Sequence, residues 1–114
     1  MTPRHRLRAS ADFRRVLRDG RAVARPEFVL YYADRAGPGF SRFGFVVSRR
    51  IGGAVSRNRV KRLLREATRS VQFVSGPVDV VLVAREPILR ARLTELQDAL
   101  VDSAERAGLT TNHR

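Results

Sequence analysis

Residues 57–71 combine an apolar stripe with an almost purely basic face, and this pairing constrains the fold more than any other feature of the chain. At 3.6 residues per helical turn, the apolar side chains fall within one arc of about 100°. They are Val60, Leu63, Leu64, Ala67 and Val71. The other side carries Arg57, Asn58, Lys61, Arg62, Arg65 and Arg69, with Arg59 at the margin. The segment therefore predicts a helix that buries one face in a core and presents cations on the other.

The basic face has almost no acidic partner within its own part of the sequence. Glu66 is the only acid in residues 35–78. A solvated helix relieves its charge with acids three or four positions away, and like charges at that spacing cost a few tenths of a kcal/mol each. Phosphate groups would relieve the repulsion, because arginine pairs with phosphate oxygens and each contact releases counterions. The pattern favours phosphate binding over a merely solvated face.

The charge of the whole chain is equally one-sided. The net charge is +12 over 114 residues, and residues 1–69 carry a surplus of +13 while residues 70–114 carry −1. A surplus of one sign is typical of a protein with an anionic partner, and nucleic acid is the commonest one. A membrane surface fits less well, because the apolar stripe of residues 57–71 is needed for the core.

Composition excludes several other classes of protein. The chain has no cysteine, which removes disulfides, thiolate metal sites and a cysteine nucleophile and fits a reducing compartment. Its longest apolar runs are too short to span a membrane. The basic start MTPRHRLR is not followed by an apolar segment, so no secretory signal is expected. We therefore expect a cytoplasmic protein of one domain.

Hydrophobic periodicity and turn residues predict six elements in the order α-β-β-α-β-α, with the first strand region allowed to split in two. The helices are expected over 11–19, 57–71 and 91–107, and the strands over 27–33, 42–48 and 78–84. Ser10 is predicted as an N-cap, and Gly20 and Gly108 as helix-closing residues. A turn is expected at 36–39 and a frayed tail at 110–114. The fold class is α+β: a two-layer α/β sandwich with helices against one sheet.

The two faces of the first strands differ in chemistry. Alternation puts Tyr31 on the face opposite Phe28, Leu30 and Tyr32, and it puts Val46 and Ser48 on a face of small residues opposite Phe43, Phe45 and Val47. Aromatic rings such as Phe13 and Tyr31 either pack in the core or stack on unpaired bases. With Arg49 and Arg50 at the rim, a groove between the first helix and the sheet would suit a single strand of nucleic acid.

Residues 46–66, VVSRRIGGAVSRNRVKRLLRE, closely resemble the signature of the bacterial ribonuclease P protein component. In that family a strand ending in Ser-basic-basic-Ile-Gly leads through Ala-Val to Arg-Asn-Arg and a basic helix. The segments RLRASADFRRVLRDG, EFVLYY and VDVVLVAREP also match the family's first helix, first long strand and late strand. The resemblance covers residues 5–105.

The resemblance implies a protein subunit that binds a catalytic RNA and promotes endonucleolytic removal of the 5′ leader from precursor tRNA. The chain is then part of an endoribonuclease, but the RNA, with Mg²⁺ that the RNA mainly holds, carries out the hydrolysis. No catalytic side chain and no cofactor on the protein itself are implied, nor an obligate protein partner or a membrane. Whether the protein contacts metal ions is left open. The family fold also implies a mixed sheet with a left-handed βαβ crossover. We expect one domain over 1–114, with mobile tails at 1–8 and 109–114.

Two sets of site residues follow from matching positions. Those expected to bind the RNA subunit are Arg57, Asn58, Arg59, Lys61, Arg62, Arg65 and Arg69. Those expected to form the groove for the precursor-tRNA leader are Phe13, Leu17, Tyr31, Val46, Ser48, Arg49 and Arg50. The chain departs from the family where many members carry a second aromatic residue (Leu17), where lysine is common (Arg49 and Arg50) and where asparagine is frequent (Gly53).

The main alternative is a non-catalytic RNA-binding structural protein of the ribosomal type, which would explain the charge but not an aromatic groove. A DNA-binding helix-turn-helix is disfavoured, because the basic helix follows a strand and the Gly52–Gly53 pair rather than another helix. A nuclease that works without RNA would need several carboxylates to hold metal ions, and the basic region offers only Glu66.

Overall fold

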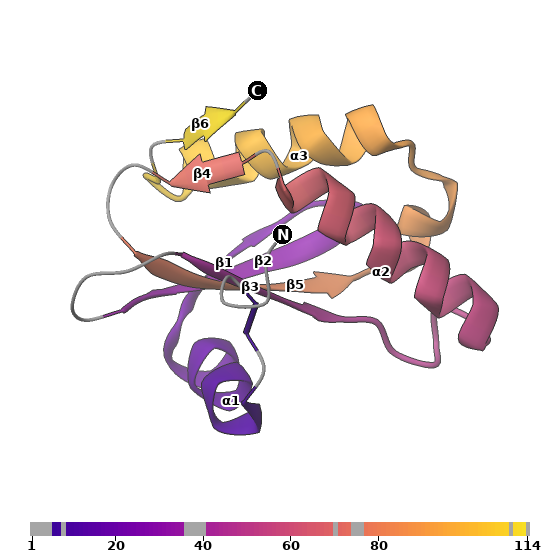
Figure 1. Ribbon diagram of the computed structural model, residues 1–114, viewed down its shortest axis with the longest axis horizontal. Helices are drawn as coiled ribbons and strands as arrows, with labels where there is room; N and C mark the ends of the chain where they lie inside the picture. The colour runs from indigo at the N-terminus through magenta and orange to yellow at the C-terminus, as the bar shows by residue number, and fades with distance from the viewer. Residues whose placement is uncertain are drawn as a thin grey trace.

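The computed structural model describes residues 6–7, 9–35, 41–69, 71–73, 77–109 and 111–113. The elements, in chain order, are α1 (Ser10–Asp19), β1 (Arg21–Ala24), β2 (Phe28–Asp34), β3 (Arg42–Val46), α2 (Ala54–Arg69), β4 (Val71–Phe73), β5 (Val78–Ala84), the 3-10 helix η2 (Glu86–Arg90), α3 (Leu93–Arg106) and β6 (Thr111–His113). Helices α2 and α3 lie over one face of the main sheet and α1 lies against the other (Figure 1). The α+β class is confirmed. The sheet with α2 and α3 forms the two expected layers, and α1 adds a third, partial one.

The main sheet has four strands in the order β1-β2-β5-β3. Strand β2 pairs antiparallel with β1 and β5, whereas β3 pairs parallel with β5, so the sheet is mixed as predicted. Because β3 and β5 are parallel neighbours, the chain crosses from one to the other through α2. That is the expected βαβ crossover, and its left hand stays a prediction. A separate two-stranded sheet pairs β4 with β6.

The core lies between the sheet and the pair α2–α3. The largest fully buried side chains there come from both layers: Phe28, Leu30, Leu64, Leu82, Ile88, Leu96 and Leu100. Full burial of such a side chain contributes about 1.5–3 kcal/mol, while each like-charge pair on a helix costs a few tenths. The buried stripe of α2, which includes Val60 and Leu64, therefore outweighs the repulsion on its basic face.

Several boundaries differ from the sequence prediction. Helix α2 begins at Ala54 rather than 57 and ends at Arg69, so Val71 is buried in β4 instead of extending the helical stripe. Residues 111–113, expected in a frayed tail, form β6. The turn predicted at 36–39 lies outside the described residues, as do 1–5, 8, 110 and 114 of the predicted tails.

The ends of α1 also differ in detail. Ala9, not Ser10, is the N-cap, and no side chain caps the helix. Gly20 closes α1 as predicted, and its N–H donates to the Val16 carbonyl, but its backbone is extended, with a φ of −78°, rather than left-handed. Glycine fits there for a steric reason: a Cβ at this position would lie 2.4 Å from the Val16 carbonyl oxygen and 2.6 Å from that of Tyr32. At the end of α3, Gly108 closes the helix as predicted, and it adopts the left-handed conformation, with φ +79°.

Candidate nucleic-acid interface

Helix α2 presents the predicted basic residues in two groups. Those exposed to solvent are Asn58, Arg59, Arg62 and Arg69, and those half-buried are Arg57, Lys61 and Arg65. We call these seven residues the α2 surface. Within the described part of the chain, Arg69 is the only one with an ion-pair partner, Glu66 at 3.0 Å. The expected shortage of acidic partners on this helix is therefore confirmed.

Arg57 lies deeper than the helical wheel indicated. Its side chain is half-buried, and its Nε is shielded from solvent without a hydrogen-bond partner among the described residues. The neighbouring Val55, by contrast, is 84% exposed, although it is apolar. The first turn of α2 contains no acid, so the partial positive charge of the helix N-terminus adds to that of the arginines. The strongest positive field of α2 is thus expected at its start.

The opposite face of the sheet carries the predicted aromatic residues. Across the strands, Tyr31 of β2 lies beside Val81 of β5, which lies beside Gly44 of β3, and the next row runs from Val29 through Val83 to Val46. Helix α1 crosses this face and buries Val16 and Val81 completely. Phe13, Tyr31, Val46 and Val83 are half-buried and pack around the buried Val16 and Val81.

Leu17 lies one helical turn beyond Phe13 and is 38% exposed. We call Phe13, Leu17, Tyr31, Val46 and Val83 the α1-side surface. The structure thus brings Phe13, Tyr31 and Val46 into one cluster, as the sequence predicted. Val83 was missed, since it was read only as part of a buried apolar run.

Ser48, Arg49 and Arg50 do not lie on the sheet. They are exposed and follow the end of β3 in a turn, in which the Ile51 N–H donates to the Ser48 carbonyl at 3.0 Å and the Gly52 N–H donates to the Arg49 carbonyl at 3.2 Å. This turn leads from Val46, at the end of β3, to the start of α2. Arg49 and Arg50 therefore lie in the chain segment that connects the α1-side surface to the α2 surface.

A buried carboxylate that sequence reasoning missed holds α1 on the sheet. Asp79 of β5 is fully buried and accepts hydrogen bonds from Arg42 of β3 and from Arg15 of α1. Arg35 lies within 3.4 Å of the same carboxylate. The hydrogen bond to Asp79 is the main cause that raises the pKa of Arg42, so this guanidinium stays charged. The sequence did hold a signal, a single acid inside the apolar run VDVVLVA.

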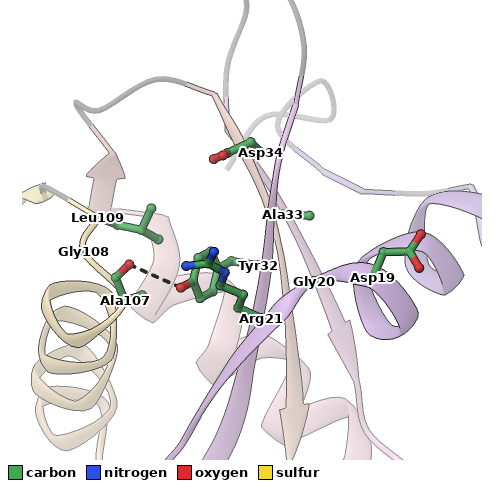
Figure 2. A pocket seen from close by; sticks show the side chains of 9 residues that line it. All are labelled: Asp19, Gly20, Arg21, Tyr32, Ala33, Asp34, Ala107, Gly108 and Leu109. Atoms are coloured by element: carbon green, nitrogen blue, oxygen red, sulfur yellow. Dashed lines mark hydrogen bonds between the residues drawn. The ribbon is translucent and has the colours of Figure 1, made fainter.

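One pocket of about 460 Å³ lies elsewhere, where the end of α1, the start of β1, the end of β2 and the end of α3 meet. Its lining residues are Asp19, Gly20, Arg21, Tyr32, Ala33, Asp34, Ala107, Gly108 and Leu109. Figure 2 shows Tyr32 reaching toward α3, where its hydroxyl donates to the Ala107 carbonyl at 3.3 Å. With two carboxylates and one arginine, this pocket does not share the cationic character of the α2 surface.

Two further features bear on the class of the protein. Among the described residues, no three histidine or acidic side chains gather in a group that could hold a metal ion. No helix in that part of the chain is long and apolar enough to cross a bilayer.

A basic helix on one face of a mixed sheet, and a partly covered aromatic surface on the other, together define a protein built to bind RNA. The sequence model of the family Ribonuclease P matches residues 1–108. The chain belongs to the ribonuclease P protein family.

Individual relatives agree with this assignment. The chain is 44% identical over 88 residues to the ribonuclease P protein component of Halalkalibacterium halodurans, covering 76% of this chain and 74% of that protein. It is 33% identical over 110 residues to that of Bacillus cereus strain 03BB102, covering 96% of both. Among solved structures, the RNase P protein of Staphylococcus aureus superposes with a TM-score of 0.76 at 29% identity, covering 90% of this chain and 94% of that one.

Membership in the family carries a general function. The protein component of ribonuclease P is an RNA-binding part of a ribonucleoprotein that processes tRNA, and its partner is the RNA of ribonuclease P. The comparisons thus confirm the family membership that the basic motif of residues 46–66 indicated.

Proposed function

We propose that the α2 surface binds the RNA subunit of ribonuclease P, and that the α1-side surface holds the 5′ leader of precursor tRNA. The observation that carries the proposal is the separation of two chemistries on opposite faces of one sheet. Apart from the pair Arg69–Glu66, the arginines of α2 lack acidic partners within the described residues. Unpaired arginines of this kind suit a phosphate backbone. The half-buried aromatic residues Phe13 and Tyr31 suit unpaired bases.

In this proposal the protein assists catalysis through charge and position. Two RNA molecules that approach each other repel through their phosphates, and a protein of net charge +12 between them lowers that repulsion. Holding the leader on a fixed surface also orients the adjoining phosphodiester bond, which lowers the entropy cost of reaching the reactive geometry. We assign no catalytic side chain to this chain.

Hydrolysis itself is assigned to the RNA subunit and to Mg²⁺ that the RNA mainly holds. Mg²⁺ prefers phosphate oxygens and water as ligands, which a folded RNA supplies. We place the reaction in the cytoplasm and expect no obligate protein partner.

The test is a reconstitution at physiological salt and low Mg²⁺. The purified protein is added to a bacterial ribonuclease P RNA with precursor tRNA labelled at its 5′ end. We expect faster release of an intact leader, and no release with protein alone. Tight RNA binding without any stimulation would instead support the second candidate, a structural RNA-binding protein of the ribosomal type.

A further inference from the structure

Gly44 occupies the centre of β3, on the face of the sheet that α1 crosses. A glycine inside a strand lacks a side chain to pack, and its position often marks the close approach of another group. Here the group is Phe13 of α1. A Cβ built on Gly44 would lie 2.4 Å from Cζ and 2.6 Å from Cε1 of that ring. Both atoms belong to the far end of the ring, so the tip of Phe13 stands directly on the backbone of β3.

Leu7 lies next to the tip of the ring on the same face of the sheet. The same Cβ would lie 3.2 Å from Cβ of Leu7, which is buried and whose backbone N–H donates to the Phe43 carbonyl at 2.9 Å. Phe13 also packs against the buried core that Leu7 forms with Val16 and Val81. The tip of the ring therefore lies on the backbone of Gly44, beside Leu7.

The other flank of α1 is held independently. On a helical wheel, Phe13 and Leu17 lie on one side of Val16, and Arg15 lies on the other. Arg15 donates a hydrogen bond to the buried carboxylate of Asp79. A side chain at position 44 would therefore act against a helix that is fixed from the far side. Relief must come mainly from the ring, which would rise by about 1 Å to reach ordinary contact distance.

We propose that Gly44 is a positioning residue for leader binding: it sets the height at which the Phe13 ring stands above the sheet. The inference rests on the proposed function of the α1-side surface. The height matters because Leu17 is aliphatic, which leaves Phe13 as the one aromatic ring on this flank of α1. In this proposal a base that contacts the Phe13 ring also contacts Tyr31 or Val83 on the sheet. A raised ring would increase the distance between the ring and those side chains, so one base could no longer contact both.

The experiment compares Gly44→Ala, Phe13→Ala and the double variant in the reconstituted holoenzyme. The substrates are precursor tRNA with a long leader and the same precursor with a leader of a single nucleotide. We expect Gly44→Ala to raise KM for the long-leader substrate about fivefold, within the range that removal of one stacked base gives. The kcat for this substrate and the KM for the short one should stay unchanged.

The double variant decides whether Gly44 acts through the ring. With the ring removed, the nearest side-chain atom to a Cβ at position 44 is Cβ of Leu7 at 3.2 Å, which a shift of a few tenths of an ångström relieves. Adding Gly44→Ala to Phe13→Ala should therefore change KM no further. An additional rise in the double variant would overturn the proposal, and so would equal effects of Gly44→Ala on both substrates. The double variant also keeps the test decisive if Gly44→Ala alone fails to fold.

Gly53→Ala is the matched control, because a Cβ there would meet no atom within 4 Å. It should behave as wild type. Failure of the proposed function is distinguishable: wild-type protein would then show no dependence of KM on leader length. If wild type shows that dependence and Gly44→Ala does not reduce it, only the inference about Gly44 is wrong.

Discussion

The Asp79 carboxylate is fully buried and accepts two hydrogen bonds from Arg42, from Nε at 2.8 Å and from Nη2 at 2.7 Å. This two-point pairing is the strong, geometrically specific form of a charged hydrogen bond. It joins β5 to β3, and Arg15 adds a link from α1 to the same carboxylate. A single acid therefore ties together three elements that carry the α1-side surface.

Replacing Asp79 with Asn should destabilise the protein. The amide keeps the shape of the carboxylate but has no charge, so the guanidinium groups of Arg15 and Arg42 would be left without their buried counter-charge. Breaking a buried pair costs about 3–5 kcal/mol, and we expect about 2–3 here because the arginines are still partly exposed to solvent. Urea unfolding of the protein alone measures the change.

The matched control is Asp19→Asn, which removes a carboxylate that pairs with the exposed Arg18. This variant should unfold at nearly the wild-type midpoint. If both variants shift the midpoint equally, the burial of Asp79 does not increase the contribution of its ion pairs to the free energy of unfolding.

Replacing Arg59 and Arg62 together with Ala should weaken binding of the RNA subunit. Both side chains are exposed on the α2 surface. The slope of log affinity against log salt concentration should fall by up to about 0.9 for each phosphate that the variant no longer neutralises. A titration of labelled RNA at several salt concentrations gives both quantities. Arg106→Ala on α3 removes an exposed arginine outside the α2 surface, and an equal effect of that control would argue against a specific RNA face.

Replacing Tyr31 with Ala should raise KM for precursor tRNA that carries a leader, by about fivefold or more, because one stacked base is worth about 1–3 kcal/mol. Binding of mature tRNA should hardly change. Steady-state cleavage and equilibrium binding measure the two effects. The neighbouring Tyr32 points to the other face, where its hydroxyl donates to Ala107. Tyr32→Phe therefore serves as the control, and it should leave both quantities unaltered.

Replacing Leu17 with Phe should strengthen leader binding. Leu17 is 38% exposed one turn beyond Phe13, so a ring can be added without overpacking the core. We expect KM for the long-leader substrate to fall several-fold. The largest decrease expected is the one that the stacking free energy of one additional base would give. The single-nucleotide leader should show no gain. A lower KM for both substrates would indicate a general increase in RNA affinity instead.

Much of the fold could be predicted because its main elements bury a periodic apolar face. The alternation of Phe28, Leu30 and Tyr32 placed β2 correctly, and the stripe of Val60 and Leu64 placed α2. The ends of α2 were wrong by a few residues, because the end of a helix depends on contacts that periodicity does not encode. Val71 fits the helical stripe equally well, but it pairs with His113 in a strand. The short strands β4 and β6 depend on each other and carry no pattern of their own.

The candidate site likewise has one part that could be predicted from the sequence and one part that could not. The α2 surface could be predicted because charge within one helix is a local property of the sequence. The contacts of Asp79 and Gly44 could not, since their partners Arg15 and Phe13 lie about 64 and 31 positions away and meet them only through the docking of α1. The assignment of Ser48, Arg49 and Arg50 to the groove stays a prediction, because these residues lie in the turn beyond β3.

The position of α1 and α2 on opposite faces of one sheet has a consequence for assembly (Figure 1). Under the proposed function, the RNA subunit and the leader would touch no protein atom in common, so neither would block the other's access. The protein could be loaded in either order and would form a bridge in the ternary complex. Under the proposed function, a bridge of this kind would make the apparent affinity for precursor tRNA depend on two contacts acting together, one through the RNA subunit and one through the sheet.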